Sequence, residues 1–146
     1  MINELIWNEE YRIGISNIDF QHKHLFEIVG RIAALDTVTS TKEELRGILI
    51  ELSNYMKEHF HDEEEYMLKI HFPEYEYHRE LHQDIVDFVN KSVTNSPSIA
   101  MIKTKLKFII KKALIDHILE EDMKIKLFVA SQTSEENLDE VLHVLS

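Results

Sequence analysis

Apolar side chains recur every three or four positions in several stretches of this chain, which is the period of an amphipathic helix. The first stretch carries Ile18, Leu25, Phe26, Val29, Ile32 and Ala33. The second carries Leu45, Ile48, Leu49, Leu52, Tyr55, Met56 and Met67. Polar residues 36–41 separate them, and Thr41 with Glu44 matches a capping box that opens a helix. The pattern predicts two long helices with a short connection.

Two further helices are predicted after Pro73, which must end the second one. Residues 74–90 restart the helical period with Leu81, Ile85, Phe88 and Val89. Residues 92–98 have the composition of a loop, and Pro97 suits the first position of the next helix. The last stretch carries Ile102, Leu106, Ile110, Leu114, Ile118, Ile125 and Val129.

Four helices joined by short connections favour an all-α, antiparallel up-down-up-down four-helix bundle. At 146 residues the chain is expected to form a single domain, residues 1–146. The bundle is predicted over about residues 16–130, after an N-terminal arm of residues 1–15. The tail offers a second capping box, Thr133 to Glu136, and an apolar stripe. A short C-terminal helix over about residues 134–145 is therefore expected to pack on the bundle exterior.

The charge and composition exclude several classes of function. The formal net charge of −11 repels phosphate backbones and anionic lipid, so no nucleic acid partner is expected. Without cysteine, any metal must be held by nitrogen and oxygen ligands. No apolar run reaches membrane-spanning length, and Met1 to Glu10 lacks the features of a signal peptide. These features predict a cytoplasmic protein with no membrane association.

Five of the nine histidines are in phase with the apolar stripes and are accompanied by in-phase carboxylates. The set comprises His22, His59, Glu63, His78, His82, His117 and Asp122. A lone histidine of this kind is more often a core residue, and an i,i+4 pair alone is as often a surface pair. Asp122 follows His117 at i+5, well round the helix, so its inward position requires a broad inner face. Inward carboxylates in an apolar stripe need a cation nearby, which favours a metal site.

Donor counting favours two metal ions over one. Five imidazoles and two bridging carboxylates supply nine donor atoms, too many for one ion of about six-fold coordination. Two such ions need about twelve positions, and an oxo or hydroxo bridge counted at both metals leaves one open. A structural metal site is the alternative, but structural sites are usually closed. The open position is where a small ligand is expected to bind.

Together these residues resemble the full ligand motif of the hemerythrin family. The matching segments are the run Asp19 to Lys23 around His22, His59-x-x-x-Glu63, His78-x-x-x-His82 and His117-x-x-x-x-Asp122. The resemblance implies two non-haem iron ions with an oxo or hydroxo bridge. It assigns His78, His82 and His117 to one iron, His22 and His59 to the other, and Glu63 and Asp122 to both. It further implies that O2 binds at the iron with two histidines, with NO and small anions as further ligands.

The sequence departs from the family pattern at two positions. Ala113 stands where many members carry Trp, one turn before His117, and Phe20 stands where an acidic residue is common. A missing indole beside the metals is expected to widen the pocket and hasten oxidation of the oxygenated protein. Leu114 and Ile118 are further candidates for the pocket wall, and plain bundle core is an equally good interpretation of Leu114.

Reversible O2 binding for storage, delivery or scavenging is the favoured function, without enzymatic turnover. No inward third or fourth carboxylate accompanies the motif, unlike the carboxylate-rich di-iron sites of ferritin-like proteins. One alternative is a di-iron enzyme that reduces peroxide or nitric oxide, which requires an electron donor site that the sequence does not reveal. Another is an oxygen or redox sensor, for which only the tail helix offers an output surface. The sequence leaves O2 affinity, redox partner and oligomeric state open.

Overall fold

The computed structural model describes residues 6–94 and 98–132, and within these ranges it contains helices and no strands. The long helices are α1 (Ser16–Ala33), α2 (Lys42–Lys69), α3 (Tyr75–Thr94) and α4 (Ile99–Ile110). Two π-helical segments continue α4, namely η3 (Lys111–Asp116) and η4 (Ile118–Asp122), and residues 123–132 are again α-helical. A short 3-10 helix, η2 (Glu9–Tyr11), precedes α1. The prediction of an all-helical protein is confirmed.

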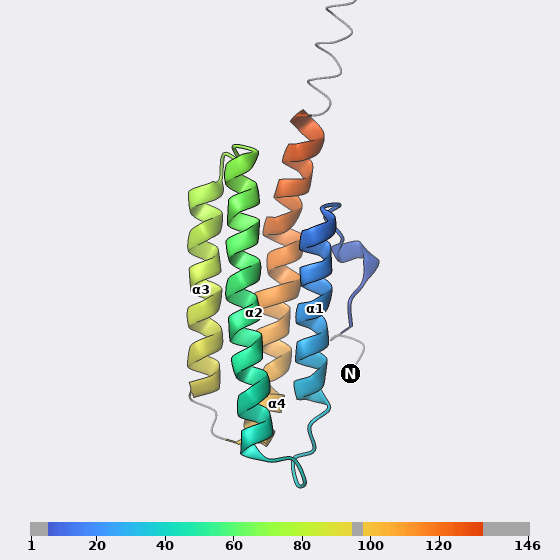
Figure 1. The fold of residues 1–146 in the computed structure, drawn as a ribbon, viewed down its shortest axis with the longest axis vertical. Coiled ribbons are helices and arrows are strands. Elements are labelled where there is room, and N and C mark those ends of the chain that lie inside the picture. Colours follow the sequence, from blue (N-terminus) through green and yellow to red (C-terminus); the bar gives the residue numbers. More distant parts are fainter. Residues whose placement is uncertain (1–5, 95–97, 133–146) are drawn as a thin grey trace, which may run out of the picture.

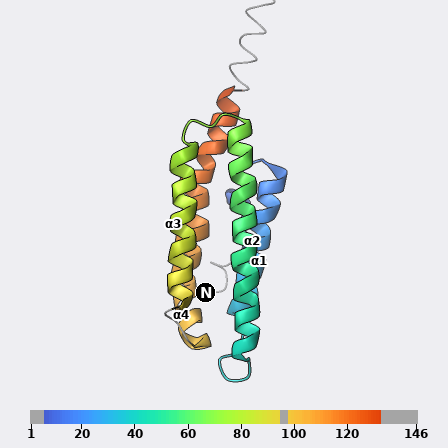
Figure 2. The ribbon, with the colours of Figure 1, turned by 60° about the vertical axis from the view of Figure 1, so that its left-hand side comes forward.

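The helices pack side by side as a bundle. α1 contacts α2, α2 contacts α3, α3 contacts α4, and α4 contacts α1, so the four surround a common interior. Figures 1 and 2 show their axes running close to the long dimension of the molecule, with residues 123–132 rising beyond the end of α3. No described helix is both long and apolar enough to cross a membrane.

Local sequence signals fix the helix ends around α2. The Thr41 side chain accepts a hydrogen bond from the Glu44 backbone N–H at 3.1 Å, as the capping-box pattern predicts. At the other end α2 stops at Lys69, and His71 adopts a left-handed φ of 57° in the turn before Pro73. The Phe72 N–H then donates to the Met67 carbonyl at 2.9 Å and closes the helix end. The predicted break near Pro73 is confirmed.

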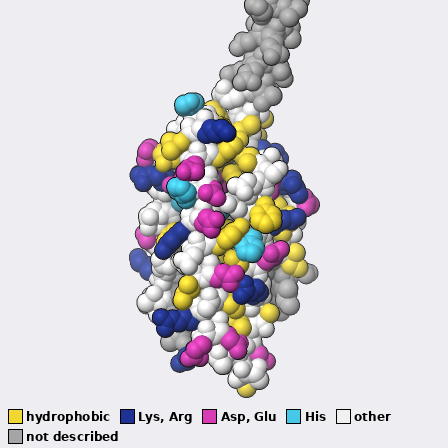
Figure 3. Space-filling view, viewed as in Figure 1, with side chains coloured by type: hydrophobic (Ala, Val, Ile, Leu, Met, Phe, Trp, Pro, Cys, Tyr) yellow, Lys and Arg dark blue, Asp and Glu magenta, His cyan; other side chains and the backbone are white. Residues whose placement is uncertain are grey.

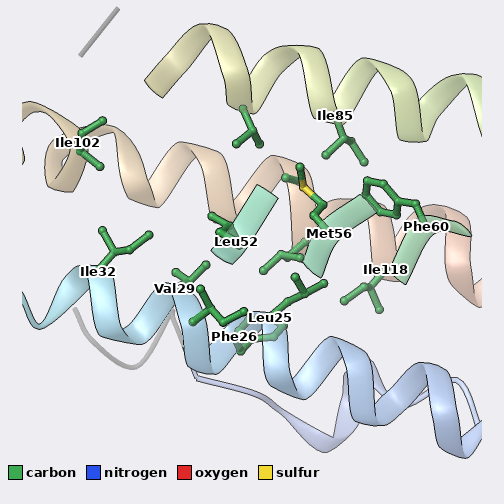
Figure 4. Packing of buried hydrophobic residues seen from close by; sticks show 14 of the residues in the cluster. Leu25, Phe26, Val29, Ile32, Leu52, Met56, Phe60, Ile85, Ile102 and Ile118 are labelled. Atoms are coloured by element: carbon green, nitrogen blue, oxygen red, sulfur yellow. The ribbon is translucent and has the colours of Figure 1, made fainter. Parts of the chain in front are cut away.

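The core consists mainly of the predicted apolar stripes. Figure 4 shows side chains of α1, α2 and α3 meeting those of the fourth helical segment between the ribbons. The most buried members of this main core cluster include Leu25, Ile28, Val29, Ile32, Met56, Ile102 and Ile118. A smaller cluster around Met67, Phe72 and Ile125 lies apart from the main one. The metal-ligating candidates lie on the same helix faces, which is why burial of these stripes positions the site.

The predicted loop over residues 92–98 begins too early, because α3 continues through Thr94. Serine and threonine disfavour a helix by only a few tenths of a kcal/mol per residue relative to better helix formers, so composition alone is a weak boundary signal. Pro97 and the predicted tail helix over residues 134–145 lie outside the described residues.

The described part of the N-terminal arm is tied to the start of α1. The buried Asp19 carboxylate accepts hydrogen bonds from the backbone N–H groups of Ile13 at 2.8 Å and Gly14 at 3.0 Å. Gly14 has a φ of +88°, a conformation that favours glycine, and this turns the chain into the helix. Ile13 is buried beneath this turn. Figure 1 shows the arm lying alongside α1 on the outside of the bundle.

The outer surface mixes charges of both signs with scattered apolar side chains, as Figure 3 shows for one face. Phe20, which stands where an acidic residue is common in the family, is 65% exposed. A solvent-exposed Phe20 does not contribute to the core.

Candidate metal centre

The structure brings all seven predicted site residues together in the bundle interior. His22 comes from α1, His59 and Glu63 from α2, and His78 and His82 from α3. His117 and Asp122 come from the continuation of α4. Both carboxylates are fully buried, and the most exposed member of the set, His117, is only 7% exposed. The ligating atoms form two overlapping groups, each within 4.8 Å, that share Glu63 and Asp122.

Glu63 faces different histidines with its two carboxylate oxygens. Its Oε1 lies 2.7 Å from His78 Nε2 and 3.0 Å from His82 Nε2. Its Oε2 lies 3.4 Å from His59 Nε2 and 3.7 Å from His22 Nε2. The carboxylate therefore stands between a pair of imidazoles from α3 and a pair from α1 and α2.

The two carboxylate oxygens of Asp122 also face different histidines. Its Oδ1 lies 2.9 Å from His78 Nε2 and 3.1 Å from His117 Nε2, and its Oδ2 lies 3.1 Å from His22 Nε2. The two carboxylates thus separate a three-histidine set (His78, His82 and His117) from a two-histidine set (His22 and His59). Two carboxylates that each offer one oxygen to each set have the arrangement needed to bridge two metal ions.

The π-helical turns explain how Asp122 reaches the site. In an α-helix a residue at i+5 points well away from residue i, as the sequence analysis noted for His117 and Asp122. In a π-helix the hydrogen bonds run from i to i+5, so the turn is wider and these two positions come onto one side. Both residues lie in or beside η4, and both are buried. The sequence analysis predicted an α-helix with a broad inner face. The structure instead shows a local change from α-helix to π-helix.

The buried carboxylates shift the pKa values of the surrounding groups. Burial by itself lowers the pKa of His22, but close contact with the negative charges of Asp122 and Glu63 outweighs it and raises the pKa to about 9. The same balance raises the pKa of His78 to about 10. Burial dominates at His59 and, with the charge of His22, lowers its pKa to about 3. Burial opposes ionisation of Glu63, but the close contact with His22 and the hydrogen bonds from His78 and His82 hold its pKa well below the usual value.

Several buried polar atoms of the cluster have no hydrogen-bond partner among the described residues. They are His22 Nδ1, His22 Nε2, Glu63 Oε2, His117 Nε2, Asp122 Oδ1 and Asp122 Oδ2. Leaving such an atom unpaired costs about 1–3 kcal/mol, and more when it is charged. Five of these six atoms, all except His22 Nδ1, lie within 3.4 Å of another member of the set. This donor set of imidazole nitrogens and carboxylate oxygens fits iron or a neighbouring transition metal.

Comparison with known proteins identifies the family. The family model described as the hemerythrin HHE cation binding domain matches residues 13–128. The chain belongs to the hemerythrin family. Bacteriohemerythrin from Campylobacter jejuni is 30% identical over 124 residues, covering 83% of this chain and 92% of that protein. Bacteriohemerythrin from Clostridium acetobutylicum is 28% identical (80% and 95% covered), and myohemerythrin from Theromyzon tessulatum is 28% identical (82% and 89% covered). No solved structure matches.

In this hemerythrin-family chain, Gln21 orients one of the site histidines. Its Oε1 can only accept a hydrogen bond, so His59 Nδ1, at 2.8 Å, must donate one. The Gln21 amide is itself oriented, because its Nε2 donates to Asp62 Oδ2 at 2.7 Å. A neutral His59 therefore carries its proton on Nδ1 and directs the lone pair of Nε2 to the site. Glu64 acts similarly on His82, accepting from Nδ1 at 3.0 Å.

We expect Gln21→Leu to lower metal affinity by about 10–100-fold, the usual effect of losing an outer hydrogen bond to a ligand histidine. Leucine leaves the buried His59 Nδ1–H without an acceptor, so both ring orientation and basicity suffer. Competition with a chelator of known affinity measures the change. Gln83→Leu is the matched control, because the Gln83 side chain donates its hydrogen bond to Asp87 on the exposed surface of α3. Equal loss of affinity in both variants would contradict the assigned role.

An apolar side chain, Phe60, packs against two members of the three-histidine set, His82 and His117. Phe60 stacks on the His82 ring with centroids 4.0 Å apart and an interplanar angle of 9°. Ala113, Leu114 and Ile118, the predicted pocket residues, are all buried in the main core cluster that contains Phe60. Hydrophobic surroundings of this kind limit solvent access to a metal site. Whether these residues contact a bound ligand remains a prediction.

Sequence reasoning missed Gln21, Phe60 and Glu64. The periodicity contains a signal for the first two, because Gln21 is three residues after Ile18 and Phe60 is four after Met56. The periodicity contains no signal for Glu64, because its neighbour Glu63 occupies the inward position. Asp19 is a further buried carboxylate, but it accepts hydrogen bonds from backbone N–H groups of the arm and belongs to neither group of candidate ligand atoms. Of the four histidines that are out of phase with the apolar stripes, His24, His61 and His71 lie outside the buried cluster, and His143 is outside the described residues.

Proposed function

We propose that this chain binds O2 reversibly at a di-iron centre, for oxygen storage, delivery or scavenging. The proposal rests mainly on the geometry of Glu63 and Asp122. One oxygen of each carboxylate lies near His78 in the three-histidine set. The other oxygen lies near His59 or His22 in the two-histidine set. The hemerythrin family generally binds O2 and iron, which supports the same interpretation. NO and small anions are expected to compete for the same position.

In this proposal His78, His82 and His117 hold one iron, and His22 and His59 hold the other. Glu63 and Asp122 bridge both ions, together with an oxo or hydroxo group. The two-histidine ion has fewer protein donors, so it is the one that keeps a position for a small ligand. When bound, the iron ions would supply reversible electron transfer to O2. The protein's part is to exclude water, hold the ligand nitrogens in place and neutralise the charge of the ions.

We also propose that the chain forms one hemerythrin-like domain with an up-down-up-down helix order. The colour gradient in Figure 1 supports the order, because it reverses direction between consecutive helices. The short connections 34–41 and 70–74 support it as well, since neither is long enough to span the length of the bundle.

The deciding experiment records the visible spectrum of the iron-loaded protein through a cycle of oxygenation and deoxygenation. We expect a band that appears when O2 is added to the reduced protein and disappears when O2 is removed. Metal analysis of the same sample is the control, because this donor set also accepts zinc, copper or manganese. Continuous O2 or peroxide consumption would favour a di-iron enzyme, and no band at all in an iron-loaded sample would contradict O2 binding.

We expect Ala113→Trp to slow oxidation of the oxygenated protein. An indole at this position adds apolar volume beside His117 and hinders water from reaching the metals. Ala113 is only 4% exposed in a packed cluster, so the larger side chain should also cost about 1–3 kcal/mol of stability. Loss of the oxygenated spectrum over time, with a melting curve, measures both effects. An unchanged or faster oxidation rate would contradict the prediction.

Metal uptake should become stronger as pH rises from 7 towards about 9–10. The pKa values of His22 and His78 are raised to about 9 and about 10. Both imidazoles are therefore doubly protonated and positively charged at neutral pH before metal binds. Metal must displace these protons, so loading at pH 7 should release them into a weakly buffered solution. A pH indicator measures the release, and chelator competition measures the affinity. Affinity independent of pH over this range would contradict the assignment of His22 and His78 as ligands.

A further inference from the structure

The N-terminal arm brings Trp7 to the two-histidine set. The Trp7 ring centroid lies 6.4 Å from that of His22 and 6.0 Å from that of Phe26, the latter at an interplanar angle of 77°. Tyr11 stacks on Phe26 with centroids 5.5 Å apart. Trp7 and Tyr11 are both partly buried against the main core cluster. The arm thus adds an aromatic layer beside His22 that the four helices do not supply.

His22 depends on this packing more than His59 or His82 does. Gln21 and Glu64 fix those two rings through hydrogen bonds to Nδ1. The Nδ1 of His22 has no such partner, although the ring is almost fully buried. Besides the contact of its Nε2 with Asp122 at 3.1 Å, the neighbouring rings of Trp7 and His59 hold its orientation, and the His59 centroid lies 4.5 Å away. Ring contacts are weaker than these hydrogen bonds to Nδ1, so removing Trp7 should loosen His22.

Within the described residues, the firm attachment of the arm lies at its junction with α1. Asp19 holds the backbone of Ile13 and Gly14, and Ile13 is buried. Trp7 lies six residues before this anchor, and the hydrogen bond from its indole N–H to Glu9 is long at 3.4 Å and solvent-exposed. The contacts that hold Trp7 inward are thus mainly ring contacts. Lifting this end of the arm exposes His22 without unfolding a helix.

The three-histidine set meets the surface differently. A surface hollow of about 780 Å³ between α3 and η3 reaches His117, and another of about 360 Å³ between α2 and α3 reaches His82. Both hollows have charged residues at their rims. The three-histidine set thus has solvent-facing edges, whereas the aromatic layer of the arm covers His22.

We propose that Trp7 is a lid and a positioning residue for the two-histidine set, and that it controls how fast small ligands exchange there. This inference rests on the proposed metal-binding function and adds to it a residue outside the ligand motif. Trp7 acts through His22 by packing against its ring, and acts on exchange by covering it. The expected consequence of its loss is faster ligand entry with the ligand set intact.

Trp7 is the only tryptophan in the chain, so its fluorescence reports on its own position. We expect titration of the metal-free protein with ferrous iron under anaerobic conditions to quench this fluorescence in proportion to the iron bound. Bound iron with unchanged fluorescence would overturn the placement of Trp7 beside the site. A wild-type chain that takes up no iron would instead overturn the proposed function on which this inference rests.

Exchange is measured by stopped-flow binding of azide, a small anion, to the oxidised iron-loaded protein. We expect Trp7→Ala to bind azide about tenfold faster than the wild type and Trp7→Phe to restore nearly the wild-type rate. Ile6→Ala is the matched control, because Ile6 is in the same arm but is 54% exposed, and it should leave the rate unchanged. If Trp7→Ala does not fold, Trp7→Leu must show the acceleration. Equal azide rates at equal iron content in the wild type and the alanine or leucine variant would overturn the proposal.

Discussion

Replacing Glu63 with glutamine should reduce the iron content from about two ions per chain to fewer than one. Glu63 is within ion-pair distance of four of the five site histidines, His22, His59, His78 and His82. Glutamine keeps the size of the side chain but removes the charge and makes one of the two bridging atoms a donor. The loss of affinity should exceed the ~100-fold seen for outer-shell changes, because a direct ligand to both ions is lost. Elemental analysis of the purified variant measures the result.

Glu65→Gln is the control for this experiment. Glu65 lies two residues further along α2, is 66% exposed, and pairs with His61 at the surface. It should keep the wild-type iron content, since exposed pairs contribute little and its side chain faces away from the site. A full complement of iron in Glu63→Gln would end the interpretation of Glu63 as a bridge. A loss in both variants would point to a general effect of charge.

Metal loading should raise the melting temperature by about 8–16 °C. Metal that binds only the folded state at about 1,000 times its Kd contributes about 4 kcal/mol. For a chain of this size, 1 kcal/mol shifts the melting temperature by about 2–4 °C. Loading also satisfies buried atoms that otherwise lack a hydrogen-bond partner, such as Glu63 Oε2 and His22 Nε2. Calorimetry of the metal-free and iron-loaded protein, both under anaerobic conditions, measures the shift.

The Glu63→Gln variant provides the comparison for the thermal experiment. Its melting temperature should rise much less on addition of the same iron concentration, because it lacks the bridge. An identical rise in the variant and the wild type would mean that iron stabilises the chain from another place. No rise in the melting temperature of the wild type would mean that the buried polar atoms of the cluster already have partners without metal.

Helix periodicity explains why most of the site could be predicted. His59 with Glu63 and His78 with His82 are one turn apart, so their shared face follows from the helix alone. The same reasoning was available for Gln21 and Phe60, which are in phase with Ile18 and Met56. No comparable signal exists for Trp7, because the arm that carries it has no regular period. Its place beside His22 depends on the Asp19 anchor and on ring contacts.

The sequence by itself determined which side chains face inward, because amphipathic period, caps and helix-breaking residues act over a few neighbouring positions. It thereby determined the helical fold and the membership of the histidine and carboxylate set. Only the tertiary structure decided that residues 111–122 adopt π turns that bring Asp122 beside His117, since this helix type depends on packing around the site. It alone also decided which carboxylate oxygen faces which imidazole, because those distances join helices far apart in the chain.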